Sequence, residues 1–445
     1  MAIRDLAARL RSIVKEDVRR VRAGSGGVDA VDISGVHYEP DVLGAALEAR
    51  DVARILHGEV RGPSCVMVDR TWDATDWHGR RRVDSYALDE ALPLAMFDAR
   101  LSAETGWASR VVFFDIETTG LSGGAGTLAF LVGCGWFEDG GFKVRQFFLS
   151  GPAGEHAMLD ALAGIFDDAS LLVTFNGRTF DVPFMEMRWA FHRRACATSD
   201  LPHFDMLPPA RKLWSRREPD DERASCTLSA LERSVLRFHR LGDVPGFEIP
   251  ARYFHFLRSG DPGVIEGVLE HNRHDLISLA ALTSRALQLA ADGPEACDSA
   301  GEQLGLARVY ELSGDEGRAI RAYELAASST DREVATRALS RLAVFFRREG
   351  RFGESAAAWE RVLERTGHAH RPLTSLERRA VEALAIHHEH RARDLDEARR
   401  YAEALRAEAS GQLVVEVNRR LGRIERKMRA ADSRKGSPAA APLLD

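Results

Sequence analysis

The chain has 445 residues, of which 45% are hydrophobic and 29% charged, and its formal net charge is −6. This length allows two or three domains with a substantial core. The acidic total does not favour nucleic acid as a partner, although the local distribution of charge matters more than the sum. Five cysteines without a C-x-x-C pair argue against a disulfide framework and a zinc knuckle. We therefore expect reduced thiols in a cytoplasmic protein.

The first 24 residues predict a basic amphipathic helix, because apolar residues recur at helical spacing with Arg and Lys on the other faces. Such a helix can touch a membrane or an acidic partner, but we expect it to dock on its own protein. We expect neither a signal peptide nor a membrane span, because charges interrupt the apolar stretches. The rest of the region 1–105 has no clear fold, although "GPSCVMVDRTW" indicates a strand and "LDEALPLAMFDARL" a helix.

Residues 106–292 have the pattern of a mixed α/β domain. The buried-type strand "VVFFDIE" precedes "TLAFLVGCGWF" and "FKVRQFFL", which flank "EDGG". This tetrapeptide is a hairpin signal, because Asp-Gly and Gly-Gly tolerate positive φ. A helix in "EHAMLDALAGIF", a strand in "SLLVTFN" and a helix in "DVPFMEMRWAFHRR" follow. The order predicts a mixed sheet flanked by helices.

Residues 299–430 predict an all-α region built from an imperfect repeat. "YELSGDEGRAIRAYELA" recurs 36 residues later as "FRREGRFGESAAAWERV", and "HRARDLDEARRYAEAL" is a fainter third copy. The pattern resembles the tetratricopeptide helix-turn-helix, whose period is ~34 residues. An irregular bundle of helical hairpins is the alternative. Residues 431–445 predict a disordered tail.

Two carboxylates, Asp115 and Glu117, end the strand that begins at Val111. Side chains alternate along a strand, so this D-x-E pair points to one side. Neighbouring anions repel each other unless a cation lies between them or one stays protonated. A solvated strand end would carry the same pattern, so the pair needs support from elsewhere in the chain.

Further candidate ligands come from two later segments. Asp181 follows a strand and a Gly turn in "TFNGRTFDVPF" and opens a helix, where it could also be an ordinary N-cap. His271 and Asp275 are four apart in the apolar-striped helix "VLEHNRHDLISLAAL", so they share a face. A structural His–Asp contact is the alternative there.

Together the motifs "FFDIETTG", "FNGRTFDVPF" and "HNRHDLISL" resemble the DEDD 3′→5′ exonucleases of the ribonuclease-H-like superfamily. Within that superfamily the chain is similar to the bacterial group of YprB-like predicted exonucleases. The likeness covers about Val111 to Leu289 and includes "HFDML", "SCTLSALE" and "DVPGFEIPARYF". It implies an α/β ribonuclease-H-like fold followed by the tetratricopeptide-like region.

The resemblance also implies two-metal hydrolysis of phosphodiester bonds. Asp115, Glu117, Asp181 and Asp275 would hold two Mg²⁺ or Mn²⁺ ions, and hard oxygen ligands suit these ions. The expected activity is a 3′→5′ exonuclease on DNA or RNA, acting on a single-stranded 3′ end. The alternatives are a structure-specific endonuclease with the same metals, or a non-catalytic scaffold whose repeats bind a protein partner.

The general base departs from the family pattern. The superfamily places a Tyr four residues before the last Asp or a His five before it, whereas this chain has His271 at position four. An imidazole is a reasonable base at neutral pH, so we expect His271 to take that role.

The resemblance further assigns substrate contacts. Thr118, Thr119 and Gly120 would let the backbone approach the terminal nucleotide, and Leu121 would pack on its base. Asn176 would touch the substrate backbone or cap its turn.

Basic residues between Arg188 and Arg217, with Trp189, Trp214 and Phe191 among them, could bind phosphates and stack on bases. A solvated helix face with core aromatics would have the same composition.

Overall fold

A computed structural model describes residues 48–101, 106–120, 126–215, 226–367 and 372–435. They belong to one compact unit that spans Gly44–Asp445. The expected N-terminal helix of residues 1–24 and the expected contact residue Leu121 lie outside the described residues. In the described part of the chain, no helix is both long enough and apolar enough to cross a membrane.

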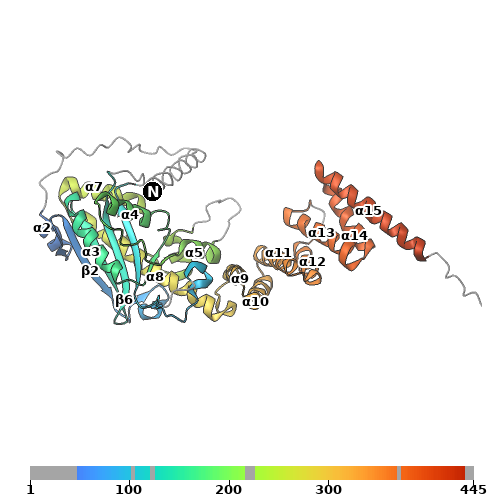
Figure 1. Cartoon of the computed structure of the whole chain (residues 1–445), viewed down its shortest axis with the longest axis horizontal. Helices are drawn as coiled ribbons and strands as arrows, with labels where there is room; N and C mark the ends of the chain where they lie inside the picture. The colour runs from blue at the N-terminus through green and yellow to red at the C-terminus, as the bar shows by residue number, and fades with distance from the viewer. Residues whose placement is uncertain (1–47, 102–105, 121–125, 216–225, 368–371, 436–445) are drawn as a thin grey trace, which may run out of the picture. The chain divides into compact units, whose positions relative to one another are not determined.

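A seven-stranded mixed sheet forms the first domain (Figure 1). The strand order is β1-β2-β7-β6-β5-β8-β9, and the interior strand β5 is antiparallel to β6 and parallel to β8. A separate hairpin joins β3 to β4. The strands are β1 (Glu59–Val60), β2 (Cys65–Trp72), β3 (Trp77–His78), β4 (Arg81–Arg82), β5 (Val111–Thr118), β6 (Ala129–Glu138), β7 (Gly141–Leu149), β8 (Leu171–Thr174) and β9 (His203–Asp205).

The strands predicted from Val111 onward are confirmed. The turn between β6 and β7 uses Asp139 and Gly140, with φ of 53° and 80°, as the "EDGG" signal predicts. The sheet also includes β1 and β2, which come from the region 1–105 for which the sequence predicts no clear fold. Strand β2 pairs along its whole length with β7, and β1 pairs with β2. The sheet therefore begins well before residue 106.

Helices cover the sheet, and the longest of them, α8, crosses β5, β6 and β7 (Figure 1). The helices of this domain are α2 (Ala49–Ile55), α3 (Glu155–Asp167), α4 (Asp181–Phe191), α5 (Leu207–Trp214), α6 (Leu228–Leu231), α7 (Ile249–Ser259) and α8 (Gly263–Asp292). Short 3₁₀ or π turns are η2 (Val83–Tyr86), η3 (Leu94–Met96), η4 (Ala99–Leu101), η5 (Pro152–Gly154), η6 (Glu232–Leu236), η7 (Gly246–Glu248), η8 (Pro294–Ala296) and η9 (His388–Ala392).

The helix predicted for "LDEALPLAMFDARL" is wrong. This segment contains only the short turns η3 and η4. Pro93 removes a backbone donor in the middle of the segment. Asp89 and Asp98 accept hydrogen bonds from the backbone N–H groups of Ala91 (2.7 Å) and Arg100 (3.2 Å). These bonds favour turns over a helix.

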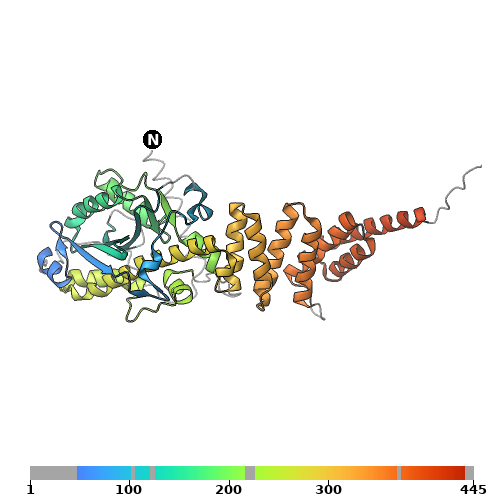
Figure 2. The same cartoon turned by 90° about the horizontal axis from the view of Figure 1, so that it is seen from below.

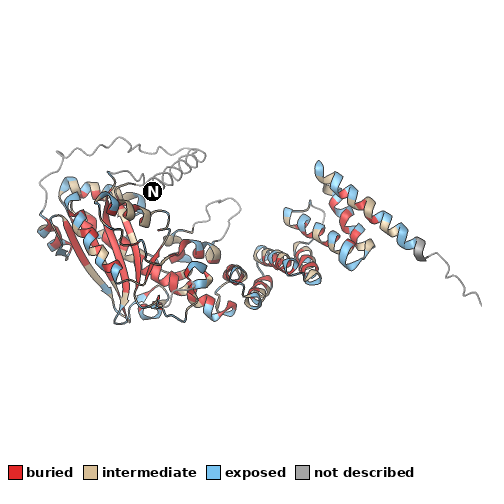
Figure 3. Cartoon of the chain, in the orientation of Figure 1, coloured by how far each residue is buried: buried red, intermediate tan, exposed pale blue. Residues whose placement is uncertain are grey.

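The interior strand β5 is buried on both faces over its first four residues (Figure 3). Val111 and Phe113 belong to the core that contains the C-terminal half of α8, while Val112 and Phe114 belong to the core beneath α3 and α4. The alternation places Asp115 and Glu117 on the same side as Phe113. The polar end of β5 therefore continues a buried stripe.

After α8 the described chain is all helical, and successive helices pack side by side (Figure 2). Each of the three repeat copies forms a helix-turn-helix, with Gly314, Gly350 and Arg393 in the left-handed conformation at the turn. The helices are α9 (Ala300–Ser313), α10 (Glu316–Ala327), α11 (Arg332–Arg348), α12 (Phe352–Thr366), α13 (Ser375–His387), α14 (Leu395–Glu408) and α15 (Gln412–Lys435).

The last helix, α15, continues to Lys435, so the first five residues of the expected tail 431–445 are helical. Val417, Leu421 and Ile424 are buried and give α15 an apolar stripe. Arg423 and Lys427 bind the carboxylate of Glu389 at 2.5–2.9 Å. Residues 436–445 lie outside the described part of the chain.

Candidate active site

The end of β5 presents two carboxylates toward α8. Asp115 and Glu117 are partly exposed, whereas Ile116 between them is buried on the opposite face. The register of β5 against β6 shifts between Glu117 and Thr118, directly after the acids. The D-x-E pair thus lies where the strand leaves the sheet.

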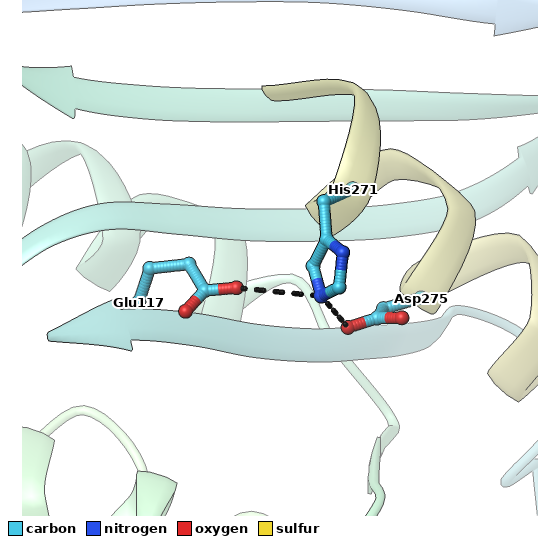
Figure 4. Close-up of side chains that lie close together, drawn as sticks. All are labelled: Glu117, His271 and Asp275. Carbon is cyan, nitrogen blue, oxygen red and sulfur yellow. Dashed lines mark ion pairs between the residues drawn. The ribbon is translucent and has the colours of Figure 1, made fainter. Parts of the chain in front are cut away.

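Helix α8 brings His271 and Asp275 to this strand end (Figure 4). The Nε2 atom of His271 lies 3.4 Å from Asp275 Oδ2 and 4.0 Å from Glu117 Oε1. One ligand atom from each of the three residues lies within 4.8 Å of the others. Among the described residues, these three side chains therefore lie close enough together that they could hold a metal ion.

Asp181 completes the acidic cluster from a third element. It is the first residue of α4 and is buried, and Phe180 stands at the N-cap position before it. Burial raises its pKa to about 7, although the backbone N–H groups of Asp181 and Ile116 oppose the shift. The charges of Asp205 and Asp275 raise the pKa further.

Burial also raises the pKa values of Asp115 and Glu117 well above their ordinary range, and the other acids add to the effect. For Asp115 these are Asp275, Glu117 and Asp181. Four carboxylates that repel one another in a partly buried site supply hard oxygen donors and excess negative charge. Both properties fit Mg²⁺ or Mn²⁺, so the residues present suit the metals that the family implies.

A buried amide network fixes Asp115 against α8. Asn272 donates a hydrogen bond of 2.8 Å to Asp115 Oδ2, and Gln146 on β7 donates one of 2.8 Å to Asn272 Oδ1. Gly133 makes this approach possible, because a Cβ there would lie 2.2 Å from Asn272 Oδ1. Sequence analysis did not assign a role to Asn272, although it lies within the quoted motif "HNRHDLISL".

A second carboxylate orients His271. Asp243 Oδ1 lies 2.8 Å from His271 Nδ1, and an ionised carboxylate can only accept, so Nδ1 carries the proton. Arg240 Nη1 lies 3.2 Å from the same nitrogen and donates to Asp243 Oδ2 at 3.3 Å. His271 therefore presents its Nε2 atom to the acidic cluster. Asp243 opens the motif "DVPGFEIPARYF", but its role was not predicted.

Arg240 links the acidic cluster to buried polar residues behind it. Its guanidinium donates to Glu232 Oε2 (2.9 Å) and Oε1 (2.5 Å) and also bonds Asp275 Oδ1. Glu232 accepts a hydrogen bond of 2.5 Å from Ser278, which lies 2.8 Å from His78. Residues of the β3–β4 hairpin thereby support the helix that carries His271 and Asp275.

Of the expected substrate-contact residues, some are bonded within their own turns and one has open space around it. Thr118 donates to the Gly120 carbonyl at 3.1 Å, and Thr119 Oγ1 accepts from Leu128 N at 3.0 Å, so both hydroxyls bind the turn. A Cβ on Gly120 would meet no atom within 4 Å, so its surroundings are open. Asn176 has a φ of 68° and accepts at Oδ1 from Thr179 (2.9 Å). This geometry favours the turn-capping alternative for Asn176.

Two basic residues of the segment between Arg188 and Arg217 are engaged within the fold. Arg188 is buried and paired with Glu155, and Arg194 forms an ion pair with Asp160. Trp189 is a core side chain that is 1% exposed. Arg188, Arg194 and Trp189 therefore serve the fold, whereas Arg193 and Phe191 are exposed. Arg216 and Arg217 lie outside the described residues.

Comparisons with known proteins agree with this geometry. Residues 112–287, which contain all four acids and His271, match the RNase H superfamily. The chain is also 30% identical over 333 residues to protein YprB of Bacillus subtilis (strain 168), an alignment that covers 74% of this chain and 77% of that protein.

Proposed function

This chain belongs to the RNase H superfamily and to the family of YprB, and from this we propose that it is a metal-dependent nuclease acting as a 3′→5′ exonuclease. The observation that carries the proposal is the convergence of Asp115, Glu117, Asp181 and Asp275 from one strand and two helices on one small site. Four carboxylates that serve only the fold rarely lie this close together, because each one disfavours the charged form of the others.

The four acids would hold two divalent cations, Mg²⁺ or Mn²⁺. Such ions, when bound, polarise phosphoryl oxygens and lower the pKa of water. Asn272 holds Asp115 in place, and Asp243 holds the His271 ring. The Nε2 atom of His271 faces the acids, and a neutral imidazole there can accept a proton from the attacking water.

Thr118, Thr119 and Gly120 lie directly after the acids, where the 3′-terminal nucleotide would approach. We assign the terminal base to Leu121, as the resemblance implies. A single-stranded 3′ end suits this arrangement, because the terminal phosphodiester must reach buried carboxylates. The helical repeats would serve as a partner-binding or substrate-binding region of the same protein.

A 5′-labelled single-stranded oligonucleotide of DNA, and one of RNA, test the activity directly. We expect purified protein with Mg²⁺ or Mn²⁺ to produce a ladder that shortens from the 3′ end. EDTA and the Asp115→Ala variant should both abolish the ladder, because each removes the metals. The two substrates report the preferred sugar.

The alternatives give different products. Internal cuts on branched or hairpin DNA, without a ladder, would replace the exonuclease with a structure-specific endonuclease. Folded protein that cuts neither substrate with either metal would favour the non-catalytic scaffold. Asp139→Ala, in the distant β6–β7 turn, is the matched control and should cut at the wild-type rate.

A further inference from the structure

Helix α5 packs tightly against α9, the first helix of the repeat region. A Cβ on Gly305 of α9 would lie 2.5 Å from the carbonyl oxygen of Lys212 and 2.7 Å from the Cα of Leu213. Trp214 Nε1 at the end of α5 donates to Glu302 Oε1 at 2.8 Å. Glu302, Gly305 and Arg308 are spaced by three, so they share one face of α9. Arg308 therefore lies beside Lys212.

Helix α11, which contacts α9, carries further positive charges. Arg337 and Arg341 are four apart on one face of α11, and Arg348 farther along that helix bonds Glu311 of α9 at 3.2 Å. Partial burial and the charges of Arg341 and Arg337 lower the pKa of Arg308. Partial burial and the charge of Arg308 lower the pKa of Lys212. We name these four residues, Lys212, Arg308, Arg337 and Arg341, the basic track.

The basic track has little compensation within the described part of the chain. There, Lys212, Arg308 and Arg341 make no side-chain hydrogen bond or ion pair. Arg337 has an exposed contact of 3.4 Å with Glu333, which is a weak pairing. The carboxylates of Asp98 and Glu311 oppose the charges of Lys212 and Arg308 only from a distance. Because the like charges repel one another, an anionic ligand would stabilise this arrangement.

The basic track starts close to the acidic cluster. Asp205, just before α5, accepts from the backbone N–H groups of Asn176 (2.8 Å) and Leu207 (3.0 Å). It thereby joins the turn that precedes Asp181 to the first residue of α5. Lys212 is the sixth residue of α5, about 8 Å along the axis from Leu207 at ~1.5 Å per residue.

We propose that the basic track binds the phosphate backbone of the nucleic-acid strand whose end occupies the active site, so that the first repeat helices extend the substrate-binding surface. The inference rests on the proposed nuclease function for the identity of the ligand. An acidic peptide has similar charge, but the link through Asp205 between the turn before Asp181 and α5 favours the substrate strand itself.

The test measures binding of fluorescein-labelled single-stranded DNA and RNA of about 5 and about 25 nucleotides across a range of salt concentrations. The Arg308→Gln/Arg341→Gln variant is made in an Asp115→Asn background, so that no cleavage occurs. Each lost phosphate contact lowers the salt slope by about 0.7 for a single strand. We expect the slope for the 25-mer to fall by about 1.4 and its affinity by roughly 10-fold. Binding of the 5-mer should be unchanged.

The matched control is Arg406→Gln/Arg419→Gln, which removes two exposed charges from α14 and α15. It should bind both oligonucleotides as the parent does. Equal 25-mer affinity and salt slope in both double variants would overturn the proposal. Tighter binding of a labelled decaglutamate peptide than of the 25-mer, lost in the Arg308→Gln/Arg341→Gln variant, would also overturn it in favour of a peptide partner.

Two further measurements keep the test decisive. Arg341 is exposed, so Arg341→Glu alone repeats the experiment without disturbing the core if the double variant does not fold. Metal-dependent cleavage of the 5-mer by the otherwise wild-type Arg308→Gln/Arg341→Gln protein reports the proposed nuclease function separately. If the 5-mer is cleaved and 25-mer binding is unchanged, only the proposal of phosphate binding by the basic track is rejected. If the 5-mer is not cleaved and 25-mer binding is weakened, only the proposed nuclease function is rejected.

Discussion

Asp115 and Glu117 are two positions apart on one strand, and Asp181 adds a third carboxyl, which is buried. Their raised pKa values mean that the folded protein without metal favours protonated carboxyls. The arrangement is unfavourable for the free protein at neutral pH. A bound cation reverses that preference, because it favours the charged form.

We therefore predict that stability without metal depends on pH. A carboxyl whose pKa is higher in the folded state stabilises the fold fully below its unfolded pKa, near ~4, and loses that contribution as pH rises through its folded value. For Asp181 this value is about 7. In EDTA the melting temperature should fall by several degrees between pH 5 and 8. Mn²⁺ should restore it at pH 8.

Differential scanning fluorimetry measures both effects. Asp181→Asn should flatten the pH dependence in EDTA and reduce the stabilisation by Mn²⁺. Glu266→Gln, an exposed site on α8, is the control and should follow the wild type. A melting temperature in EDTA that rises over this pH range would contradict the assignment of raised carboxyl pKa values.

The pairing of His271 with Asp243 leads to a kinetic prediction. His271→Ala should lower kcat by roughly 10²–10⁴-fold if His271 is the base, while the Mn²⁺-induced rise in melting temperature persists. Asp243→Ala should lower kcat by about 10–100-fold with KM nearly unchanged, because the ring loses its orientation.

The double variant separates positioning from an independent role. If Asp243 acts through His271, the His271→Ala/Asp243→Ala protein should be no slower than His271→Ala alone. Additive losses would mean that Asp243 acts on the reaction by another route. Loss of the Mn²⁺-induced stabilisation in His271→Ala would make His271 a metal ligand instead.

Sequence analysis could identify the residues that carry the chemistry but not those that hold them. Asp115, Asp181 and His271 stand in local motifs, and strand or helix periodicity already gives their direction. Asp243 and Arg240 reach His271 from a segment about 30 residues earlier. Their role depends on how an irregular loop packs, and no local periodicity encodes that contact.

At the scale of elements, the site depends on how closely α8 approaches β6. Gly133 on β6 lies opposite Asp115 in the register, and the lack of a side chain there lets Asn272 and Leu276 pack on the sheet. A strand glycine normally weakens a sheet. Here it allows the contact that fixes Asp115.

We predict that Gly133→Ala separates α8 from the sheet. The added Cβ would lie 2.2 Å from Asn272 Oδ1 and 2.8 Å from Leu276 Cδ1, so the helix or the strand must shift. We expect a loss of about 1–3 kcal/mol in the free energy of unfolding and a fall in kcat of at least 10-fold. Urea denaturation and the 3′-ladder assay measure these two effects.

The control for this substitution is Gly164→Ala on α3, where a Cβ would meet nothing within 4 Å. Because Ala favours a helix over Gly, this variant should gain about 0.5–1 kcal/mol with unchanged activity. Wild-type activity in Gly133→Ala would mean that the Asn272–Asp115 contact does not support the site.

Element prediction succeeded where periodicity was strong and failed where side chains competed with the backbone. The repeat helices and the β6–β7 hairpin were predictable from their turn residues. The segment around Pro93 had helical apolar spacing, but Asp89 and Asp98 bond the backbone there. The pairing of β2 with β7 could not be predicted, because it joins segments about 75 residues apart.

At the scale of the whole molecule, the sheet domain and the repeats share a hydrophobic core. One cluster of buried side chains extends from Phe113 through α8 and α9 to Ile424 of α15. Such continuity predicts that the described regions unfold together. The contact of α5 with α9 at Gly305 lies between them and also aligns Lys212 with Arg308.

Gly305→Ala should therefore affect stability and binding of long substrates together. The added Cβ would meet the backbone of Lys212 and Leu213 at 2.5–2.8 Å, and backbone cannot move aside as a flexible side chain can. We expect the denaturation curve to broaden or split in two, and the affinity for a 25-nucleotide strand to fall while cleavage of a 5-mer continues. Gly317→Ala on α10, with nothing within 4 Å of its Cβ, should change neither. A single sharp transition with wild-type 25-mer affinity in Gly305→Ala would show that the repeats bind the strand independently of the α5–α9 contact.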